Sequence, residues 1–483
     1  MANASITEKN KTSLAAKASL WYAVCSGLQK CLGLIVIPIY TRLMSEGDYG
    51  TYVVFQSWTE IVAIFVTLNL GSYVFNNGMM KFKNDRDGFA SSMLGLTGLI
   101  GIAWMIIFLV APSFWSGVFG LAAPYVFLLV LRCIVLPSYS YWSAKLRYEF
   151  RYKPVVALTL VLSIATPVAS IPAILFSSDK VAAALVVQVL VMMIVYLVPL
   201  CSIIKRSRKF FSIKYWVFAL KFNLPLIPHL LSTVILQQAD RIMISNICGS
   251  AFAAIYSVAY SAGLAMSFIH SAIVQALTPW MYQTIEAKDY GRIQPVSMAI
   301  LAIVGGASLL LTLFAPEIMM LLAPASYYEG IYAIPPVAAC VILMTAFNLF
   351  VTVEYYFEET LWVMTASIIA AVLNVALNFL LLPVFGFLAA AYTTLLCYFL
   401  LVVGHCVLMR KAMKKHGMNA QLFDLKHIYG IIILFVGLMV ACSAIYSHIA
   451  IRYSILAVFA LAIFVKRSWI KEKIDFIMGA RAK

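Results

Sequence analysis

Long apolar runs, separated by short charged or turn-forming segments, occupy almost the entire chain. Most of them reach the length of about 20 residues that a helix needs to cross a bilayer. The runs predict fourteen helices, at 14–40, 49–75, 90–111, 121–144, 154–176, 181–204, 215–245, 251–279, 295–322, 331–353, 361–382, 386–409, 428–447 and 451–465. They lack the alternation of polar and apolar residues seen in barrel strands, so we expect an all-α, polytopic membrane protein.

Composition supports this class and excludes a soluble one. Of the 483 residues, 63% are hydrophobic and only 11% are charged, whereas soluble domains are roughly 45–50% apolar and about 25% charged. The nine cysteines have no paired metal spacing and lie almost wholly in apolar runs. We therefore interpret them as small buried hydrophobic residues.

The net charge of +16 indicates orientation in a membrane rather than nucleic-acid binding. If the N-terminus is cytoplasmic, 28 of the 35 Lys and Arg residues fall in inner segments, three in outer loops and four within spans. Cytoplasmic loops of membrane proteins carry such an excess of basic residues. We expect fourteen membrane-spanning helices with both termini in the cytoplasm.

The sequence also contains an internal repeat. At an offset of 204 residues, one ungapped alignment pairs Lys17 with Lys221, Tyr52 with Tyr256, Asp85 with Asp289, Gly101 with Gly305, and Ala111-Pro112 with Ala315-Pro316. Six helices per repeat predict two parallel six-helix bundles around a central cavity. The expected domains are an N-terminal bundle at 1–210, a C-terminal bundle at 211–412, and two additional helices with a cytoplasmic tail at 413–483.

A few ionisable residues lie within the predicted spans. The basic residues are Lys30, Arg132, Lys221 and Arg241, and of the nineteen acids only Glu60 and Asp240 lie clearly within spans. Charged groups at membrane depth are costly and normally face protein or a water-filled cavity. Lys221 is near the inner end of its helix, where it can also extend to the interface. An excess of buried base over acid suits an anionic ligand.

The seventh predicted helix contains Pro225 and Pro228, followed by His229. Proline kinks a helix, and in transporters such breaks often flank the binding site, although a purely structural kink is equally compatible with the sequence. Histidine can titrate near neutral pH. Glu60, Asp240 and His229 are thus candidate carriers of a coupling ion, while Asp240 and Arg241 can instead form a local salt bridge.

The sequence contains no phosphate-binding Gly-rich loop, metal cluster or nucleophile elbow. We therefore predict no catalytic residue, no metal site and no cofactor.

Three groups of residues resemble one known family. Leu224-Pro225-Leu226-Ile227-Pro228, Asp240-Arg241, Gly249 and Tyr256 resemble the seventh and eighth helices of bacterial polysaccharide flippases. Tyr40, Arg42, Asp48-Tyr49-Gly50 and Tyr52 resemble the loop after their first helix, and Leu373-Asn374, Leu377-Asn378, Leu382-Pro383, Gly386, Ala389-Ala390-Ala391 and Thr393 resemble their eleventh and twelfth helices. This family of O-antigen, capsule and exopolysaccharide repeat-unit transporters belongs to the multidrug/oligosaccharidyl-lipid/polysaccharide exporter superfamily.

The resemblance implies a function in polysaccharide biosynthesis, including that of lipopolysaccharide. Such flippases move an undecaprenyl-pyrophosphate-linked oligosaccharide from the cytoplasmic to the periplasmic leaflet, and related members draw on ion gradients. Lys30, Arg132, Arg241 and Lys221 would then bind pyrophosphate or sugar. Implied partners are the lipid-linked glycan, membrane lipids, a polysaccharide polymerase and a chain-length regulator, with no nucleic acid.

Three other classes compete with this interpretation. A multidrug antiporter of the same superfamily would bind organic cations and would need a buried acidic cavity, whereas base exceeds acid here. A membrane glycosyltransferase or polysaccharide polymerase would need acidic residues in a large outer loop, and all predicted outer loops are short. A structural scaffold gives no reason for buried Lys and Arg.

Overall fold

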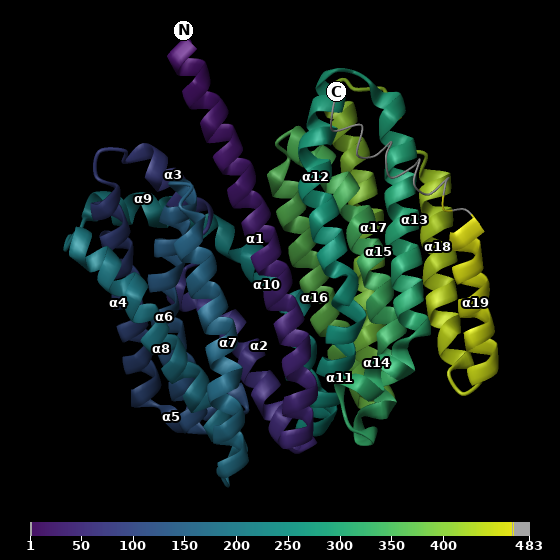
Figure 1. The fold of residues 1–483 in the computed structure, drawn as a ribbon, viewed down its shortest axis with the longest axis horizontal. Helices are drawn as coiled ribbons and strands as arrows, with labels where there is room; N and C mark the ends of the chain where they lie inside the picture. Colours follow the sequence, from purple (N-terminus) through teal and green to yellow (C-terminus); the bar gives the residue numbers. More distant parts are fainter. Residues whose placement is uncertain (1, 466, 468–483) are drawn as a thin grey trace. The chain divides into compact units, whose positions relative to one another are not determined.

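A computed structural model describes residues 2–465 and 467, and this part of the chain is helical, without a strand (Figure 1). The predicted all-α membrane fold class is therefore confirmed. The chain divides into two compact units, Met1–Ala254 and Ile255–Lys483, which we describe separately. The predicted tail from Lys466 onward lies outside the described residues, apart from Arg467.

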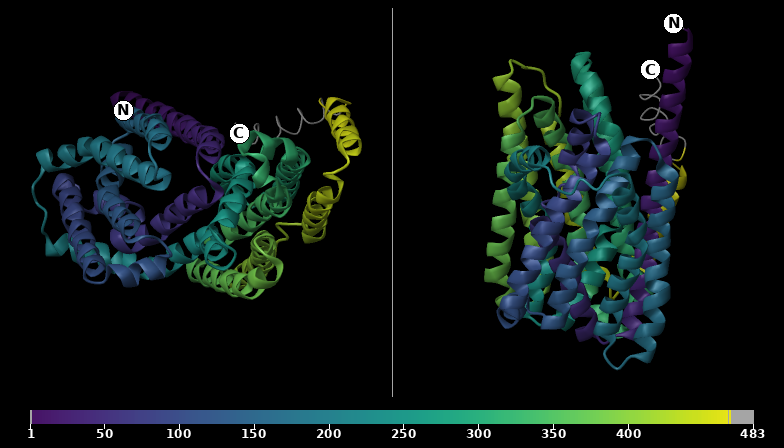
Figure 2. Two further views of the ribbon diagram at one scale, coloured as in Figure 1. Left: turned by 90° about the horizontal axis from the view of Figure 1, so that it is seen from below. Right: turned by 90° about the vertical axis from the view of Figure 1, so that its left-hand side faces the viewer.

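The first unit is built from long helices, with short helices and one 3₁₀ turn between them. Its elements are α1 (Ala2–Leu43), α2 (Glu46–Thr67), α3 (Tyr73–Lys81), α4 (Arg86–Val110), α5 (Pro112–Phe119), α6 (Ala123–Tyr148), α7 (Tyr152–Phe176), α8 (Lys180–Arg206), α9 (Ile213–Asn223), the 3₁₀ turn η1 (Leu224–Leu226) and α10 (Ile227–Ile247). Helix α6 packs against α2, α4 and α8, and α7 packs against both α8 and α1. These helices run side by side (Figure 2).

The second unit is centred on one buried helix. Its elements are α11 (Ser250–Gly263), which begins in the first unit, η2 (Leu264–Met266), α12 (Ser267–Glu286), η3 (Tyr290–Arg292), α13 (Ile293–Leu313), α14 (Ala315–Leu322), η4 (Ala325–Ala333), α15 (Ile334–Tyr356), α16 (Thr360–Phe385), α17 (Leu388–Lys415), α18 (Leu425–Cys442), η5 (Ser443–Ile445) and α19 (Ile449–Val465). Helix α15 packs against α12, α13, α17 and α18. Surrounded in this way, α15 is apolar on every side.

Twelve helical segments of the described chain are long and apolar enough to cross a membrane. They coincide with twelve of the fourteen predicted spans. The predicted span at 49–75 corresponds to α2, and the one at 451–465 to α19, of which Ile449–Val458 forms a shorter apolar helix. The protein is thus a multi-pass membrane protein.

The structure interrupts several of the predicted spans, among them 251–279 at the 3₁₀ turn η2. The span at 49–75 ends at Thr67 and resumes as α3, because Leu68 and Asn69 adopt left-handed φ angles of 48° and 49°. The span at 295–322 breaks after α13, and Pro316 lies in the first turn of α14. The predicted kink at the two prolines of 215–245 is confirmed by the 3₁₀ turn η1.

The repeat is present in the order of elements. In each half a long helix, α4 or α13, precedes an eight-residue helix, α5 or α14, and three further long helices follow. The paired Ala111-Pro112 and Ala315-Pro316 occupy the starts of the two short helices, as the offset of 204 predicts. The division into bundles at 210 and 412 follows the repeat and stays a prediction.

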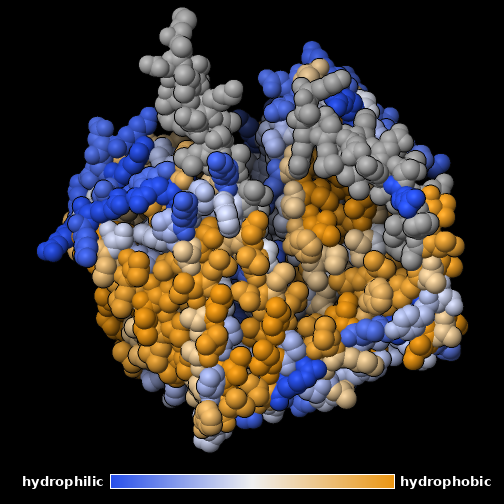
Figure 3. Space-filling view, viewed as in Figure 1, coloured by the Kyte–Doolittle hydropathy of each residue, from blue (hydrophilic) through white to orange (hydrophobic). Residues whose placement is uncertain are grey.

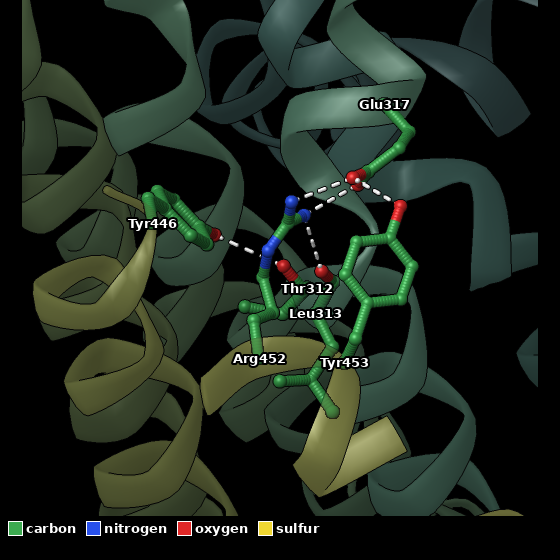
Figure 4. Close-up of polar contacts among 6 residues, drawn as sticks. All are labelled: Thr312, Leu313, Glu317, Tyr446, Arg452 and Tyr453. Carbon is green, nitrogen blue, oxygen red and sulfur yellow. Dashed lines mark hydrogen bonds and ion pairs between the residues drawn. The ribbon is translucent and has the colours of Figure 1, made fainter. Parts of the chain in front are cut away.

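The last helix is attached to its unit by a polar cluster around Arg452 (Figure 4). The guanidinium of Arg452 donates through both terminal nitrogens to the carboxylate of Glu317 on α14, with Nη2 to Oε1 at 2.6 Å, and to the carbonyl of Leu313 at 3.0 Å. Nearby, Tyr446 donates to the carbonyl of Thr312 at 3.0 Å and Tyr453 to Glu317 at 3.0 Å. Arg452 was counted among the three basic residues of outer loops, but it lies in α19 and is almost fully buried.

Partial burial alone would raise the pKa of Glu317. The hydrogen bonds from Arg452 and Tyr453 outweigh this effect and hold the pKa below its ordinary value of 4.5. Glu317 is therefore a carboxylate at neutral pH, and the Arg452 cluster is an ion pair whose charges cancel.

Candidate functional site

The first unit contains a guanidinium held by neutral amides. Arg132 of α6 donates from Nη1 to Oε1 of Gln56 on α2 at 2.6 Å and to Oε1 of Gln188 on α8 at 3.4 Å. The two amides are linked to each other, because Gln56 donates to Gln188 at 2.8 Å. Within the described part of the chain, Arg132 has no carboxylate partner, and its buried Nε has no hydrogen bond. Arg132 thus keeps its positive charge and spare donors.

A second arginine lies on another side of α2. Arg241 of α10 donates to the side chain of Gln238 at 3.2 Å, and Gln238 accepts from Ser57 at 3.2 Å. Ser57 directly follows Gln56, so successive residues of α2 point toward the two arginines. We call Gln56, Ser57, Arg132, Gln188, Gln238 and Arg241 the polar layer.

The members of the polar layer lie at similar depths in their helices. Gln56, Arg132 and Gln188 are eight to ten residues after the first residues of α2, α6 and α8, and Gln238 is nine residues before the end of α10. All four helix ends belong to the predicted outer side. At a rise of 1.5 Å per residue, this distance corresponds to about 12–15 Å, near the middle of a 30 Å hydrocarbon core.

The remaining candidate bases do not join this layer. Lys30 of α1 and Lys221 of α9 are exposed, and neither makes a hydrogen bond or ion pair with any described residue. Beside Lys30, Gln29 donates to Ser163 of α7 at 3.4 Å and so joins α1 to α7. The structure therefore brings Arg132 and Arg241 to α2 but leaves both lysines at exposed positions.

The candidate ion carriers have three different environments. Glu60 is exposed on α2, one turn after Gln56. Asp240 is fully buried in α10, next to Arg241. His229 is half-buried at the start of α10, and its Nδ1 is buried without a hydrogen-bond partner.

The residues that resemble the flippase loop after the first helix pack around the start of α2. Tyr52 of α2 packs between Tyr40 and Tyr49, with ring centroids 5.5 and 6.0 Å away. Gly50 lies against the backbone of Ser250, where a Cβ would collide with the Ser250 carbonyl. Glycine is thus needed at position 50 for close contact between α2 and the start of α11.

The second motif region forms a buried network between α16 and α17. Asn374 donates to Thr394 at 3.1 Å, and Asn378 to Asn374 at 3.4 Å, while Thr393 donates to Asn378 at 2.5 Å. All four side chains are buried. The network satisfies polar groups that would otherwise be unpaired in an apolar bundle.

Glu354 of α15 and His405 of α17 form a buried ionisable pair that the sequence did not predict. Their side chains are 0% and 1% exposed, and His405 Nδ1 lies 2.9 Å from Glu354 Oε1. The expectation that only Glu60 and Asp240 are acids within spans is wrong, because α15 extends past Glu354 to Tyr356. His405 lies inside an apolar run, and this position is the sequence feature that could have indicated a buried acidic partner.

The end of the first unit that carries α3 and α9 is rich in basic residues, among them Lys81, Lys83 and Lys209. Blue hydrophilic atoms gather there in Figure 3, whereas orange apolar atoms cover the sides of the helices. Lys209 and Tyr215 donate to Asp85 at 2.8 and 2.6 Å. Partial burial would raise the pKa of Asp85, but these hydrogen bonds outweigh it and lower the pKa. The loops of this end are thereby fixed to one another.

No group of three or more His, Cys, Asp or Glu side chains that could hold a metal ion is found among the described residues. None of the nine cysteines forms a disulfide bond with another described residue.

Comparisons with known proteins agree with this architecture. The family model described as "Polysaccharide biosynthesis protein" matches residues 15–285, which is more than half of the chain. The protein therefore belongs to the polysaccharide biosynthesis protein family. No curated protein sequence matches the chain.

Solved structures with the same fold are flippases and transporters. The lipid II flippase MurJ, in an inward closed conformation, superposes with a TM-score of 0.67 at 13% identity, over 93% of this chain and 99% of MurJ. An outward-facing multidrug resistance MATE transporter of the MOP superfamily gives 0.58 at 16% identity, over 84% and 97%. A MOP superfamily transporter from Pyrococcus furiosus gives 0.58 at 15% identity, over 84% and 96%. These similarities establish the fold.

Proposed function

We propose that the protein is a flippase that moves undecaprenyl-pyrophosphate-linked oligosaccharide repeat units from the cytoplasmic to the periplasmic leaflet by alternating access. Family membership supports a function in polysaccharide biosynthesis, and the fold is one used by flippases and transporters. The proposal places the protein in the bacterial inner membrane with cytoplasmic termini, as the distribution of basic residues predicts.

The observation that carries the proposal is the environment of Arg132. A guanidinium at the centre of a membrane helix costs about 2.5–3.5 kcal/mol on insertion scales. Two glutamine amides offset part of this cost without cancelling the charge. A pyrophosphate would complete the set through charge-assisted hydrogen bonds to the spare donors of Arg132.

The polar layer could also lower the cost of moving a polar substrate through the membrane. Pyrophosphate and sugars would lose their hydrogen bonds to water in hydrocarbon, at a cost of several kcal/mol per polar group. Arg132 and Arg241, on two sides of α2, replace water for the pyrophosphate, while the polyprenyl tail stays in lipid. Lys30 and Lys221 are further proposed contacts for phosphate or sugar, because both are exposed and unpaired among the described residues.

We further propose that an ion gradient drives the cycle. One elementary charge moving through 100 mV releases about 2.3 kcal/mol, enough to bias a conformational step. Glu60, Asp240 and His229 are the proposed carriers. Flipping in liposomes that responds to neither a pH gradient, a sodium gradient nor a potential would refute the coupling but not the flippase function.

Deletion of the gene tests the flippase function directly. We expect lipid-linked repeat units to accumulate on the cytoplasmic face of the membrane, and wild-type protein to restore export. Arg132→Gln should fail to restore it, while Asn77→Ala, on the basic end of the same unit, serves as a matched control that should restore it. Unchanged export in the deletion strain, or export restored fully by Arg132→Gln, would overturn the proposal.

A multidrug antiporter has the same fold. A positive centre without a carboxylate partner at Arg132 disfavours organic cations as ligands. Unchanged drug sensitivity of the deletion strain is therefore expected.

A further inference from the structure

A pocket of about 400 Å³ lies within the first unit, at the end that carries α3. This volume is within the range of about 300–1,000 Å³ that is usual for small-molecule sites. Its walls are the end of α2 with the following loop, the start of α3 and one side of α6. The lining residues are Thr67, Asn69, Gly71, Ser72, Asn76, Pro137, Tyr139, Ser140, Tyr141, Ser143, Ala144 and Arg147.

An unusual backbone forms the wall between α2 and α3. Leu68 and Asn69 both have positive φ angles, a conformation that is unfavourable for non-glycine residues and is concentrated at functional sites. Asn223 donates to the carbonyl of Leu68 and fixes the turn from the side of α9. Ser72 donates to Oδ1 of Asn69 at 3.0 Å, which orients the amide.

The loop is pressed closely against α6. A Cβ on Gly71 would lie 2.8 Å from the Cβ of Ser140, so only glycine allows this approach. The hydroxyls of Ser140 and Ser143 donate to the carbonyls of Leu136 and Ser140, at 3.3 and 3.1 Å. Their oxygens therefore keep lone pairs that can accept hydrogen bonds from a ligand.

The chemistry of the lining is neutral and polar, with one cation. It combines serine and threonine hydroxyls, two asparagine amides and tyrosine rings, without a carboxylate. Asn76 is exposed, and its side chain makes no hydrogen bond with any described residue. Arg147 is exposed and lies over the ring of Tyr22, with 5.1 Å from Cζ to the centroid. Hydroxyl-rich ligands match such a mixture of donors and acceptors, and Arg147 suits a phosphate beside them.

We infer that this pocket is a subsite that binds the sugar nearest the pyrophosphate when the substrate enters from the cytoplasmic leaflet. The inference rests on the proposed flippase function and names a second station for the same substrate. Arg147 follows Arg132 by fifteen residues on α6, or about 22 Å along the helix. One pyrophosphate cannot contact both arginines at once. Arg147 therefore meets it at the leaflet, and Arg132 meets it in mid-membrane.

Binding measurements on the purified full-length protein in nanodiscs test the subsite with two probes. One is undecaprenyl pyrophosphate, and the other is the same lipid carrying a single N-acetylglucosamine. Wild-type protein should bind the glycosylated probe more tightly. Asn69→Ala and Asn76→Ala should each weaken binding of that probe by about 2- to 12-fold, the effect of one lost hydrogen bond, and leave the bare lipid unaffected.

Two further variants keep the test decisive. Asn76→Trp, at an exposed position, should block the pocket and reduce binding of the glycosylated probe alone, without requiring a change in the loop. Asn77→Ala, at the neighbouring residue outside the pocket, should change nothing. Equal affinity of the wild type for both probes, or equal effects of the pocket variants on both, would overturn the subsite.

Failure of the subsite can be told apart from failure of the proposed function. Arg132→Gln should weaken binding of both probes to the same extent. If it does so while the pocket variants have no selective effect, the flippase function stands and the subsite is refuted. If wild-type protein binds neither probe, the proposed function itself is refuted.

Discussion

Two arginines on membrane helices have opposite environments. Arg452 in the second unit is 2% exposed and is neutralised by the carboxylate of Glu317. Arg132 in the first unit is half-buried, and among the described residues it donates to glutamine amides alone and has an unpaired Nε. A guanidinium with all charge cancelled attaches one helix to another. One that keeps its charge can bind an anionic ligand, as we propose for Arg132.

Replacement of Arg132 should have the largest effect on transport. Hydrogen bonds to charged groups contribute about 1.5–3 kcal/mol, so Arg132→Gln should slow flipping in liposomes by roughly 10- to 150-fold. Arg132→Lys keeps the charge but not the fork of donors and should show an intermediate rate. Thermal unfolding of Arg132→Gln should match that of the wild type, and a lower melting temperature would indicate a structural role instead.

Replacement of Arg452 should reduce the stability of the folded protein and leave substrate binding unchanged. Breaking a fully buried ion pair costs about 3–5 kcal/mol. Because Glu317 is 34% exposed, water screens the charge left behind, and we expect about 2–3 kcal/mol for Arg452→Ala. Unfolding of the purified protein measures this loss. The double variant with Glu317→Gln should lose little more than Arg452→Ala alone, and additive losses would contradict the pairing.

One substitution can give Arg132 an environment like that of Arg452. Gln188→Glu would give Arg132 a carboxylate neighbour, as Arg452 has in Glu317. An ion pair contributing about 1 kcal/mol would then compete with the substrate, so flipping should fall roughly fivefold. Gln188→Leu, without a charge, is the matched control. A rate in Gln188→Glu no lower than that of Gln188→Leu would show that the free charge of Arg132 is unimportant.

Acid should weaken the Arg452 cluster slightly. The folded-state pKa of Glu317 lies below 4.5, so its contribution to stability is present above pH 4.5 and is lost as the pH falls through the folded value. This effect is the smallest of the four, because the carboxylate is partly exposed. The stability difference between wild type and Glu317→Gln should shrink below pH 4.5. A constant difference would exclude an ionised Glu317.

The fold was largely predictable from the sequence because hydropathy is a one-dimensional property. Runs of apolar residues located the helices, and the Ala-Pro pairs at 111–112 and 315–316 revealed the repeat. The break after Thr67 was not predictable, since left-handed geometry at Leu68 and Asn69 comes from tertiary contacts such as the one from Asn223. Hydropathy could not separate α2 from α3.

The candidate site was predictable only in part. Arg132 and Arg241 were selected because charge in an apolar run is costly, but their partners Gln56, Gln188 and Gln238 are neutral and carry no such signal. Glu354 lies one residue past the end of a predicted span and Arg452 near the start of another, so neither stood out as a buried charge. Pairing with His405 and Glu317, far away in the sequence, is visible only in three dimensions.

Affinity for bare undecaprenyl pyrophosphate tests the contrast between the two arginines most directly. The measurement compares wild type, Arg132→Gln and Arg452→Ala in nanodiscs, at a temperature where all three are folded. We predict that Arg132→Gln raises the Kd by roughly 10- to 150-fold and that Arg452→Ala leaves it unchanged. An unchanged Kd in Arg132→Gln would contradict the account.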